Sequence, residues 1–349
     1  MLALRKTAAA FGLDLVEVEG PTQPAPGFVT IDVAAAGICG SDLHAYEWTP
    51  GYEFMAEAMP VTLGHEFAGT VRAVGDGVTD VAPGDAVTCW PTVTCGACES
   101  CRAGRPQLCA RRSIIGLHTD GGFAARVAVP SRNCRPVPAG LPFEIAALAE
   151  PLSIAVNAVD VAEVAAGERV VVLGPGPIGL AIAFVAQERG ARVLLAGLDD
   201  DLRLATAHRM GIAHTVDLRG ESLEAAVGRI LGGPADRGLE ATGVARSVAD
   251  GLAVLRPGGV MVVAGIHSAP LALDLTAFVR AKKQLRAAHD TTPQALDEAI
   301  RLLALRADRL AALITHRRPL TEAVEAFDLA RSRAAVKVML LPQGKDDAA

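Results

Sequence analysis

Three continuous apolar runs, each ending in glycine, constrain the fold of this chain more than any other feature. They read RVVVLG (169–174), ARVLLAG (191–197) and VMVVAG (260–265), and helix-like segments such as IGLAIAFVAQERG (178–190) lie between them. Parallel strands that are buried on both faces have such unbroken apolar sequences, and their alternation with helices is typical of a doubly wound sheet. The sequence therefore predicts an α/β domain with a parallel sheet.

The turn after the first run carries a phosphate-binding pattern. GPGPIG (174–179) fits G-x-G-x-x-G, follows an apolar strand directly and opens a helix, which is the context that the pattern requires. Gly174 permits the tight turn, Gly176 lets the backbone approach a pyrophosphate, and Gly179 allows close packing of helix and strand. The helix N-terminus then stabilises the phosphate charge. We expect a bound dinucleotide here, and the alternative is an ordinary glycine-rich turn.

Acidic residues follow the second run. Asp199, with Asp200 behind it, lies about 20 residues after the glycine loop, where a carboxylate typically binds the ribose 2′-hydroxyl of NAD. These carboxylates would repel a 2′-phosphate, and Arg203 is the only cation close by in the sequence. NAD is therefore favoured over NADP. Two points leave the choice between NAD and NADP open. Aspartate also suits a helix N-cap. In addition, Leu198 and not an aspartate stands directly after the strand, where the carboxylate is usual, so Asp199 needs a slight shift in the loop.

The two ends of the chain have other patterns. FVTIDVAAAG (28–37) and DAVTCW (85–90) are short runs between turn signals, which indicates a β-rich domain over residues 1 to about 150. Near the C-terminus, ALDEAIRLLALRADRL (295–310) and TEAVEAFDLARSR (321–333) have helical periodicity, and VKVMLL closes the chain as a strand. A length of 349 residues also suits two domains.

A cluster of cysteines lies in the stretch TCGACESCRAGRPQLC (94–109). The spacing C-x2-C-x2-C-x7-C supplies four thiolates within one loop, enough to close a tetrahedral shell, which is typical of a structural zinc site. The chain has seven cysteines and no secretory leader, so zinc is favoured over disulfides. The predicted ligands are Cys95, Cys98, Cys101 and Cys109.

A second group of metal-binding residue types is spread over three short segments. Any one of them alone is more often structural than functional. Together they supply one thiolate, one imidazole and carboxylates, which is the mixture of a zinc site that keeps a coordination position open. The segments are GICGSDLH with Cys39, Ser41, Asp42 and His44, LGHEFAG with His65 and Glu66, and LAEPLS with Glu150.

Composition excludes some classes of protein. A net charge of −6 argues against a generic nucleic-acid binder. Four arginines nevertheless make the cysteine cluster locally basic. A zinc protein that associates with nucleic acid is therefore the alternative function from another class of protein. No apolar run is long enough to span a bilayer, and the N-terminal residues lack the features of a signal peptide. We expect a cytoplasmic protein with neither membrane nor nucleic acid as partner.

The motifs together resemble those of the zinc-dependent medium-chain dehydrogenase/reductases, especially the polyol (sorbitol) and threonine dehydrogenase branch. The likeness covers essentially the whole chain in the family's order: GICGSDLH, GHEFAGTVRAVG, PGDAV, CGACESC, GGFAARVAVP, EPLSIAVNAV, GPGPIG and RPGGVMVVAG. The resemblance implies a GroES-like catalytic domain from residues 1–152 and 290–349, with the zinc lobe at about 90–112. A Rossmann domain, 153–289, is inserted between these parts.

The resemblance also implies a catalytic zinc ion held by Cys39, His65 and an acidic residue. Glu66 resembles the ligand carboxylate of the polyol branch, whereas Glu150 stands where other alcohol dehydrogenases carry a second ligand cysteine. Both alternatives stay open. The resemblance implies two zinc ions per subunit. It also implies that the protein is a homotetramer or homodimer.

The implied reaction is the oxidation of a secondary alcohol, a polyol or sugar alcohol, to a ketone. Zinc stabilises the alkoxide, Ser41 accepts the hydroxyl proton, His44 passes it to solvent, and a hydride moves to nicotinamide. Asp42 orients His65. L-Threonine is the alternative substrate, and a non-catalytic NAD- and zinc-binding protein is a remote alternative. Tyr46 and Glu150 are expected to contact substrate, and further cofactor contacts are expected at Pro177, Ile178, Thr242, Gly265 and Ile266.

Overall fold

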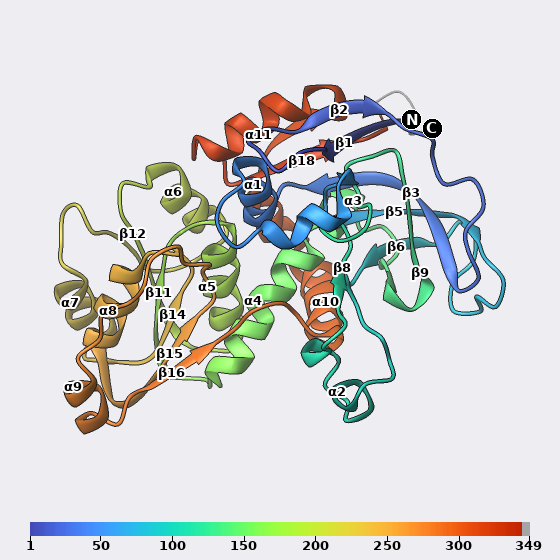
Figure 1. The fold of residues 1–349 in the computed structure, drawn as a ribbon. Coiled ribbons are helices and arrows are strands. Elements are labelled where there is room, and N and C mark those ends of the chain that lie inside the picture. The colour runs from blue at the N-terminus through green and yellow to red at the C-terminus, as the bar shows by residue number, and fades with distance from the viewer. Residues whose placement is uncertain (344–349) are drawn as a thin grey trace. The chain divides into compact units, whose positions relative to one another are not determined.

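The computed structural model describes residues 1–343 and divides them into two compact units (Figure 1). Unit 1 comprises Met1–Glu150, Thr291–Ala307 and the described residues from Ile314 on, and unit 2 comprises Pro151–Asp290 and Asp308–Leu313. The short segment 308–313 was expected in the same domain as its neighbours. It belongs to unit 2 because the Arg309 guanidinium lies 4.7 Å from the Phe184 ring centroid and pairs with Glu188 at 3.0 Å.

Unit 2 contains six strands and five α-helices of its own. The strands are β11 (Arg169–Leu173), β12 (Arg192–Gly197), β13 (Thr215–Asp217), β14 (Ala235–Glu240), β15 (Leu255–Val263) and β16 (Gln284–Ala287). The helices are α5 (Pro177–Glu188), α6 (Asp201–Arg209), α7 (Leu223–Ala226), α8 (Ala245–Val254) and α9 (Leu275–Arg280).

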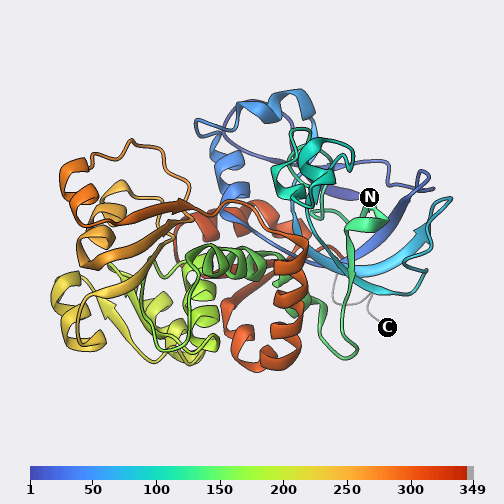
Figure 2. The same cartoon turned by 90° about the horizontal axis from the view of Figure 1, so that it is seen from below.

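These strands form one parallel sheet in the order β13-β12-β11-β14-β15-β16. From β11 the chain runs through α5 to β12 at one side, whereas α8 connects β14 to β15 at the other. Right-handed crossovers in opposite directions place the helices on opposite faces of the sheet (Figures 1 and 2). Val171 and Leu173 of β11 accordingly pack with Val248 and Leu252 of α8. The predicted doubly wound α/β fold is confirmed.

Unit 1 is rich in short strands. They are β1 (Leu2–Lys6), β2 (Asp14–Glu17), β3 (Phe28–Gly37), β4 (Val61–Thr62), β5 (Glu66–Val74), β6 (Ala86–Cys89), β7 (Thr92–Val93), β8 (Ser113–Ile114), β9 (Arg126–Pro130), β10 (Cys134–Pro136), β17 (Ile314–Pro319) and β18 (Lys337–Leu341). Its helices include α1 (Gly40–Glu47), α2 (Glu99–Arg102), α3 (Phe143–Ala146) and α11 (Ala323–Arg331), with the 3₁₀ turns η1 (Glu53–Ala58) and η2 (Pro106–Leu108). Two helices, α4 (Ala149–Ala162) and α10 (Pro293–Leu310), cross from one unit into the other.

The largest sheet of unit 1 joins the two ends of the chain. Its order is β10-β6-β5-β3-β18-β17, with β9 also paired to β3. β3 pairs antiparallel with β5 on one side and with β18 on the other, so that Gly37 lies opposite both Glu66 and Met339. The end of β3, the start of β5 and the C-terminal strand therefore meet at one place.

One helical stretch, Phe143–Ala162, is long and apolar enough to cross a membrane by length and composition, with a mean hydropathy of 1.5. The sequence alone predicted no such stretch. Because 78% of its most apolar window is buried inside the protein, it has the character of a core helix in a soluble protein.

Candidate metal and cofactor sites

Cys39, His65 and Glu66 lie together in unit 1. Their ligand atoms are all within 4.8 Å of one another. Cys39 is the N-cap of α1, and His65 and Glu66 stand at the start of β5, which pairs with the end of β3. The close fit requires glycine at position 37, since a Cβ atom there would lie 2.3 Å from a Glu66 oxygen. The pairing of β3 with β5 thus assembles the group that the sequence predicted.

Asp42 and Ser41 approach the two nitrogens of His65 from opposite sides. Asp42 Oδ1 lies 3.6 Å from His65 Nδ1, while its Oδ2 accepts a hydrogen bond from the Cys39 backbone at 2.9 Å. The Ser41 hydroxyl lies 3.2 Å from Nε2. His65 Nδ1 and Asp42 Oδ1 are buried and have no hydrogen-bond partner among residues 1–343. A small movement of the ring would let Asp42 hold Nδ1 and leave Nε2 to a metal ion, as second partners of metal-binding histidines do.

Lys337 is a member of this group that the sequence did not reveal. Its ammonium donates to both Glu66 carboxylate oxygens at 2.7 Å and to the Ile38 carbonyl at 2.9 Å. The side chains of Lys337 and Glu66 are 2% and 0% exposed. The only sequence signal is a lysine inside the apolar run VKVMLL, because a buried charge needs a partner.

Burial and neighbouring negative charges shift the pKa values of this group. Burial, together with the nearby Glu66 carboxylate, raises the pKa of the Cys39 thiol to about 12. Burial also raises the pKa of Asp42 to about 6 and that of Glu150 well above its ordinary value. Burial lowers the pKa of His65, but the Asp42 and Glu150 carboxylates outweigh it and the net shift is upward. Thiol, imidazole and carboxylate in so acidic a setting fit a divalent ion such as zinc.

The two candidate carboxylates differ in their surroundings. Glu66 shares the 4.8 Å group, but both of its oxygens are engaged by Lys337. Glu150, the second residue of α4, is 5% exposed and lies close enough for the His65, Glu66 and Cys39 charges to act on its pKa. Geometry places Glu66 nearer to Cys39 and His65, while the charge of Lys337 acts on both carboxylates. Either could complete the shell.

Two other predicted residues lie on α1. His44 Nδ1 is 3.0 Å from the Thr49 hydroxyl, and burial lowers the pKa of the imidazole. Tyr46 does not have the position expected of a substrate contact. Its ring packs against Phe11 and Phe327, its hydroxyl donates to Asp328 at 3.0 Å, and the residue is 4% exposed. We correct this assignment, because Tyr46 faces the core of unit 1 instead.

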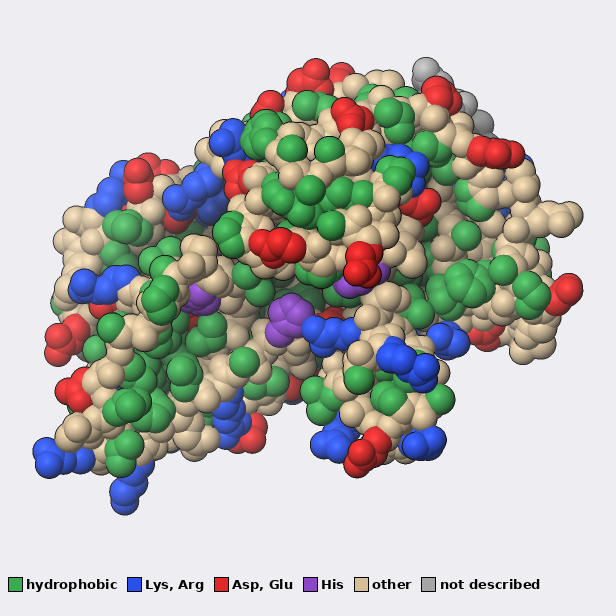
Figure 3. Space-filling model, in the orientation of Figure 1, with side chains coloured by type: hydrophobic (Ala, Val, Ile, Leu, Met, Phe, Trp, Pro, Cys, Tyr) green, Lys and Arg blue, Asp and Glu red, His purple; other side chains and the backbone are tan. Residues whose placement is uncertain are grey.

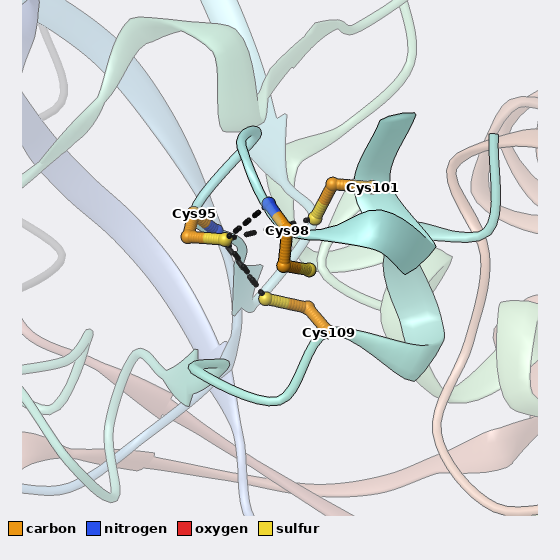
Figure 4. Close-up of side chains that lie close together, drawn as sticks. All are labelled: Cys95, Cys98, Cys101 and Cys109. Carbon is orange, nitrogen blue, oxygen red and sulfur yellow. Dashed lines mark hydrogen bonds between the residues drawn. The ribbon is translucent and has the colours of Figure 1, made fainter. Parts of the chain in front are cut away.

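The four cysteines of the predicted cage converge in the loop around α2 and η2 (Figure 4). All four sulfurs lie within 4.8 Å of one another, with Cys95 Sγ 3.5 Å from Cys109 Sγ and 4.0 Å from Cys101 Sγ. Four sulfurs at 2.3 Å from one zinc ion would stand about 3.8 Å apart, so the spacing suits zinc. Backbone N–H groups lower the pKa of Cys95 to about 5, which favours the thiolate.

The cage lobe is covered with cationic side chains, which are visible on the projection that carries α2 (Figure 3). Because a thiolate cage with zinc has a net negative charge, surrounding arginines would offset it. The exposed arginines of the lobe are Arg102, Arg105, Arg111 and Arg112.

The glycine loop in unit 2 has the geometry that a dinucleotide pyrophosphate needs. Gly174 has a φ of +98°, and a Cβ atom at Gly179 would lie 1.7 Å from the Gly174 carbonyl oxygen. At Gly176 a Cβ atom would meet nothing within 4 Å, so the backbone is open to a ligand. Pro177 and Ile178 form the first turn of α5, whose N-terminus attracts phosphate.

A buried carboxylate organises the neighbouring loops. Glu240, at the end of β14, accepts hydrogen bonds from the Gly243 backbone at 2.8 Å and from the Thr242 backbone and hydroxyl at 2.5 Å. Its other oxygen lies 2.9 Å from His267 Nε2. Gly265 and Ile266 lie on the loop that His267 ties down. Glu240 thus holds in place the loops that carry three of the predicted cofactor contacts.

The acidic segment after β12 is arranged differently from the sequence expectation. Asp199 has a φ of +57°, and its carboxylate pairs with Arg219 at 2.6 Å. Arg219 also pairs with Asp201 at 2.8 Å and with Asp217 at 2.5 Å. Hydrogen bonds from the Arg219 side chain and backbone lower the pKa of Asp217 to about 2. Arg203, expected to be the only nearby cation, is instead paired with Asp200 at 3.6 Å. Arg219 was missed because it follows another strand, β13.

Known proteins resemble this chain over its whole length. A family model described as the alcohol dehydrogenase GroES-like domain matches residues 25–139, and one described as the glucose dehydrogenase C-terminus matches residues 143–340. A sorbitol dehydrogenase of Halalkalibacterium halodurans is 33% identical, covering 98% of this chain and 99% of the relative. An L-threonine 3-dehydrogenase of Pyrococcus abyssi is 34% identical, covering 98% of each.

Solved structures agree. An alcohol dehydrogenase of Escherichia coli CFT073 in complex with NADH superposes with a TM-score of 0.88 at 27% identity, covering 98% of this chain and 99% of the other. A zinc-binding dehydrogenase of Sinorhizobium meliloti 1021 bound to NADP has a TM-score of 0.86 at 31% identity, with the same coverage.

Proposed function

This chain belongs to the medium-chain dehydrogenase/reductase family, and on that basis we propose that it oxidises a secondary alcohol, a polyol or sugar alcohol, to a ketone. It is an alcohol dehydrogenase that uses zinc and NAD(P). The observation that carries the proposal is the meeting of Cys39, His65 and Glu66 within 4.8 Å, with the Ser41 hydroxyl 3.2 Å from His65 Nε2.

The side chains around the metal group have complementary tasks. Held by Cys39, His65 and an acidic residue, zinc would supply a Lewis acid that lowers the pKa of the substrate hydroxyl. Ser41 is the hydroxyl beside that position and can accept the substrate proton. His44, three residues further along α1, lies on the same helix face. Because burial lowers the pKa of His44 and Thr49 holds its Nδ1, the neutral ring can take a proton at Nε2.

A substrate panel tests this function. We expect formation of NADH or NADPH, followed by absorbance, with polyols such as sorbitol, and loss of that activity after chelation. A metal-free preparation that oxidised polyols at the full rate would contradict the proposal. Elemental analysis should find two zinc ions per chain, one for each ligand group.

L-Threonine is the second candidate substrate. L-Threonine 3-dehydrogenases are as similar to this chain as the sorbitol dehydrogenase is, at 33–35% identity. The same zinc group would act on the threonine hydroxyl, which is also a secondary alcohol. The substrate panel distinguishes the two functions, since kcat/KM should be higher either with a polyol or with L-threonine.

We further propose that NAD is preferred over NADP. The acidic cluster Asp199, Asp201 and Asp217 carries three negative charges against the single charge of Arg219. A 2′-phosphate would meet net repulsion there. Replacing both Asp199 and Asp201 with asparagine removes two negative charges and frees the Arg219 N–H groups that these carboxylates hold, although Asp217 still pairs with Arg219. This change should raise kcat/KM for NADP about tenfold, or about 1.4 kcal/mol.

The control is Glu221→Gln, which removes a carboxylate that pairs with Arg229 rather than with Arg219. It should leave the ratio of kcat/KM values for NAD and NADP unchanged. A wild-type enzyme that already prefers NADP would show that Arg219 binds the phosphate despite the carboxylates.

A homodimer or homotetramer is also proposed. Within the described residues β16 is the last strand of its sheet and pairs with β15 alone, so its other edge can pair with a second copy. Leu285 on β16 and Leu275 and Val279 on α9 are 42%, 64% and 68% exposed. A chain with Leu285→Lys and Val279→Lys should elute as a monomer, whereas wild type elutes as an oligomer. A monomeric wild type by light scattering would contradict this.

The cytoplasmic location stays a prediction.

A further inference from the structure

Two buried thiols face each other at the base of the lobe that carries the cysteine cage. Cys89 is the last residue of β6 and Cys134 is the first residue of β10, and the antiparallel pairing of these strands sets the two directly opposite each other. Their sulfur atoms lie 3.9 Å apart, and both thiols are free. Neither residue belongs to a metal-ligand group, so the two zinc sites do not account for the pair.

The position of the pair in the strand ladder suits a covalent link. The Trp90 backbone N–H, one residue after Cys89, donates to the Asn133 carbonyl, one residue before Cys134, at 2.8 Å. This bond makes the two cysteines a non-hydrogen-bonded pair, in which opposing Cα atoms are about 4.5 Å apart and the side chains approach most closely. Disulfides span Cα distances of about 4.4–6.8 Å. Rotation of the two side chains can therefore bring the sulfurs to bonding distance with the strand pairing intact.

The two thiols differ in their access to solvent. Cys89 is 1% exposed and Cys134 is 6% exposed. Burial and the neighbouring Cys134 thiol raise the pKa of Cys89 well above its ordinary value, and Arg135 offsets only part of this shift. A small oxidant that enters from solvent therefore meets Cys134 first, while Cys89 keeps its proton.

A link between these cysteines would close the segment that carries the cage. Residues 90–133 lie between them and contain all four cage ligands. The base of this segment is already held by the Asn133 side chain, which donates to the carbonyls of Trp90 and Thr92 at 2.7 and 3.0 Å. A covalent link at the same base would restrict the unfolded segment, and this matters most when no zinc ion holds the cage together.

We propose that Cys89 and Cys134 are an oxidation site, which hydrogen peroxide converts to a reversible disulfide, and that this link preserves the cage lobe when its zinc ion is lost. The site uses neither the metal group with Cys39 nor a nicotinamide cofactor. The inference is therefore independent of the proposed alcohol oxidation.

The oxidation balances with one molecule of peroxide. The Cys134 sulfur loses its proton and attacks one peroxide oxygen, which gives a sulfenic acid and a hydroxide ion, and the released proton turns that hydroxide into water. The Cys89 sulfur then attacks the sulfenic sulfur and displaces hydroxide, which leaves with the Cys89 proton as a second water. The two sulfurs together lose two electrons, which peroxide accepts, and a dithiol reductant returns the pair to thiols.

Mass spectrometry of the zinc-loaded full chain tests the site. The protein is treated with hydrogen peroxide, its remaining thiols are alkylated after unfolding, and the digest is fragmented. Cys89 and Cys134 should be joined and lighter by two hydrogens, dithiothreitol should remove the link, and the four cage cysteines should carry the alkyl label. In Cys89→Ala the sulfenic acid should persist on Cys134 and react with dimedone, whereas in Cys134→Ala the Cys89 thiol should stay reduced.

Thermal unfolding tests the effect on the lobe. Chelation should lower the thermal midpoint of the peroxide-treated wild type by several degrees less than that of the reduced wild type. The alanine variants Cys89→Ala and Cys134→Ala are the matched controls, since they cannot form the link. Peroxide treatment should leave the effect of chelation on their midpoints unchanged.

Two outcomes would overturn the inference, and neither measurement uses a substrate. A peroxide-treated wild type in which both cysteines are still alkylated, or in which either is joined to a cage cysteine, would contradict the oxidation site. Equal losses on chelation in the linked and the reduced protein would contradict the protection of the lobe.

Discussion

Replacement of Cys39 with serine is expected to lower kcat for alcohol oxidation at least about a thousandfold, equivalent to about 4 kcal/mol of transition-state stabilisation. Cys39 is the one thiol of the mixed group, and the harder serine oxygen is a poor ligand for zinc. The zinc content should fall from two ions to one, while the free energy of unfolding of the chelated protein changes little. Activity assays and elemental analysis of the same preparation make the measurement.

Two other cysteine variants are the controls. Cys89→Ala removes a buried thiol that lies 3.9 Å from Cys134 and belongs to neither ligand group, so this variant should keep both ions and full kcat. Cys101→Ser opens the cage and should lower the thermal midpoint, because metal binding there contributes to folding. A Cys39→Ser enzyme with both ions and wild-type turnover would refute the assignment of Cys39 as a ligand.

Zinc uptake by the metal-free protein should also depend on pH. The Cys39 thiol, with a pKa of about 12, is protonated at neutral pH and must release its proton to bind the ion. Zinc affinity should therefore fall as the pH is lowered, through protonation of the ligands. The dependence should persist in Cys101→Ser, whose remaining high-affinity group is the one with Cys39.

The parallel sheet and the cysteine cage could be predicted because each is encoded locally. The apolar runs ending at Leu173, Gly197 and Val263 are strands buried on both faces, and their unbroken apolar character is visible in the sequence itself. The four cysteines fall within one loop, so their spacing alone specifies a closed shell. The insertion of the Rossmann domain into the catalytic domain and the convergence of Cys39, His65 and an acidic residue were predicted from the family resemblance and not from a local sequence pattern.

The remaining parts depend on contacts between distant segments. Lys337 pairs with Glu66, 271 residues away, because β18 happens to lie beside β3. Arg219 reaches Asp199 from the neighbouring strand, and a helical pattern on α1 could not show that Tyr46 faces Asp328. Periodicity predicts which residues form an element but not which elements become neighbours, so these partners were not visible in the sequence.

Replacement of Lys337 with methionine should lower the free energy of unfolding of the metal-free protein by about 3–5 kcal/mol. The change leaves the Glu66 carboxylate, which is fully buried, without the ammonium that contacts both of its oxygens. Methionine has a similar length and apolar character, so the packing of β18 should change little. Urea denaturation of the chelated protein measures the loss.

The control for this variant is the double variant Lys337→Met with Glu66→Gln, in which no charge is left unpaired. It should regain most of the lost stability, and a loss equal to that of Lys337→Met would mean that packing and not charge is responsible.

Zinc then distinguishes the two candidate carboxylates. If Glu66 binds the ion, zinc should stabilise Lys337→Met more than wild type, because the ion replaces the missing ammonium. If Glu150 alone binds it, zinc should stabilise both proteins equally, since the Glu66 charge in Lys337→Met would stay unpaired with or without zinc.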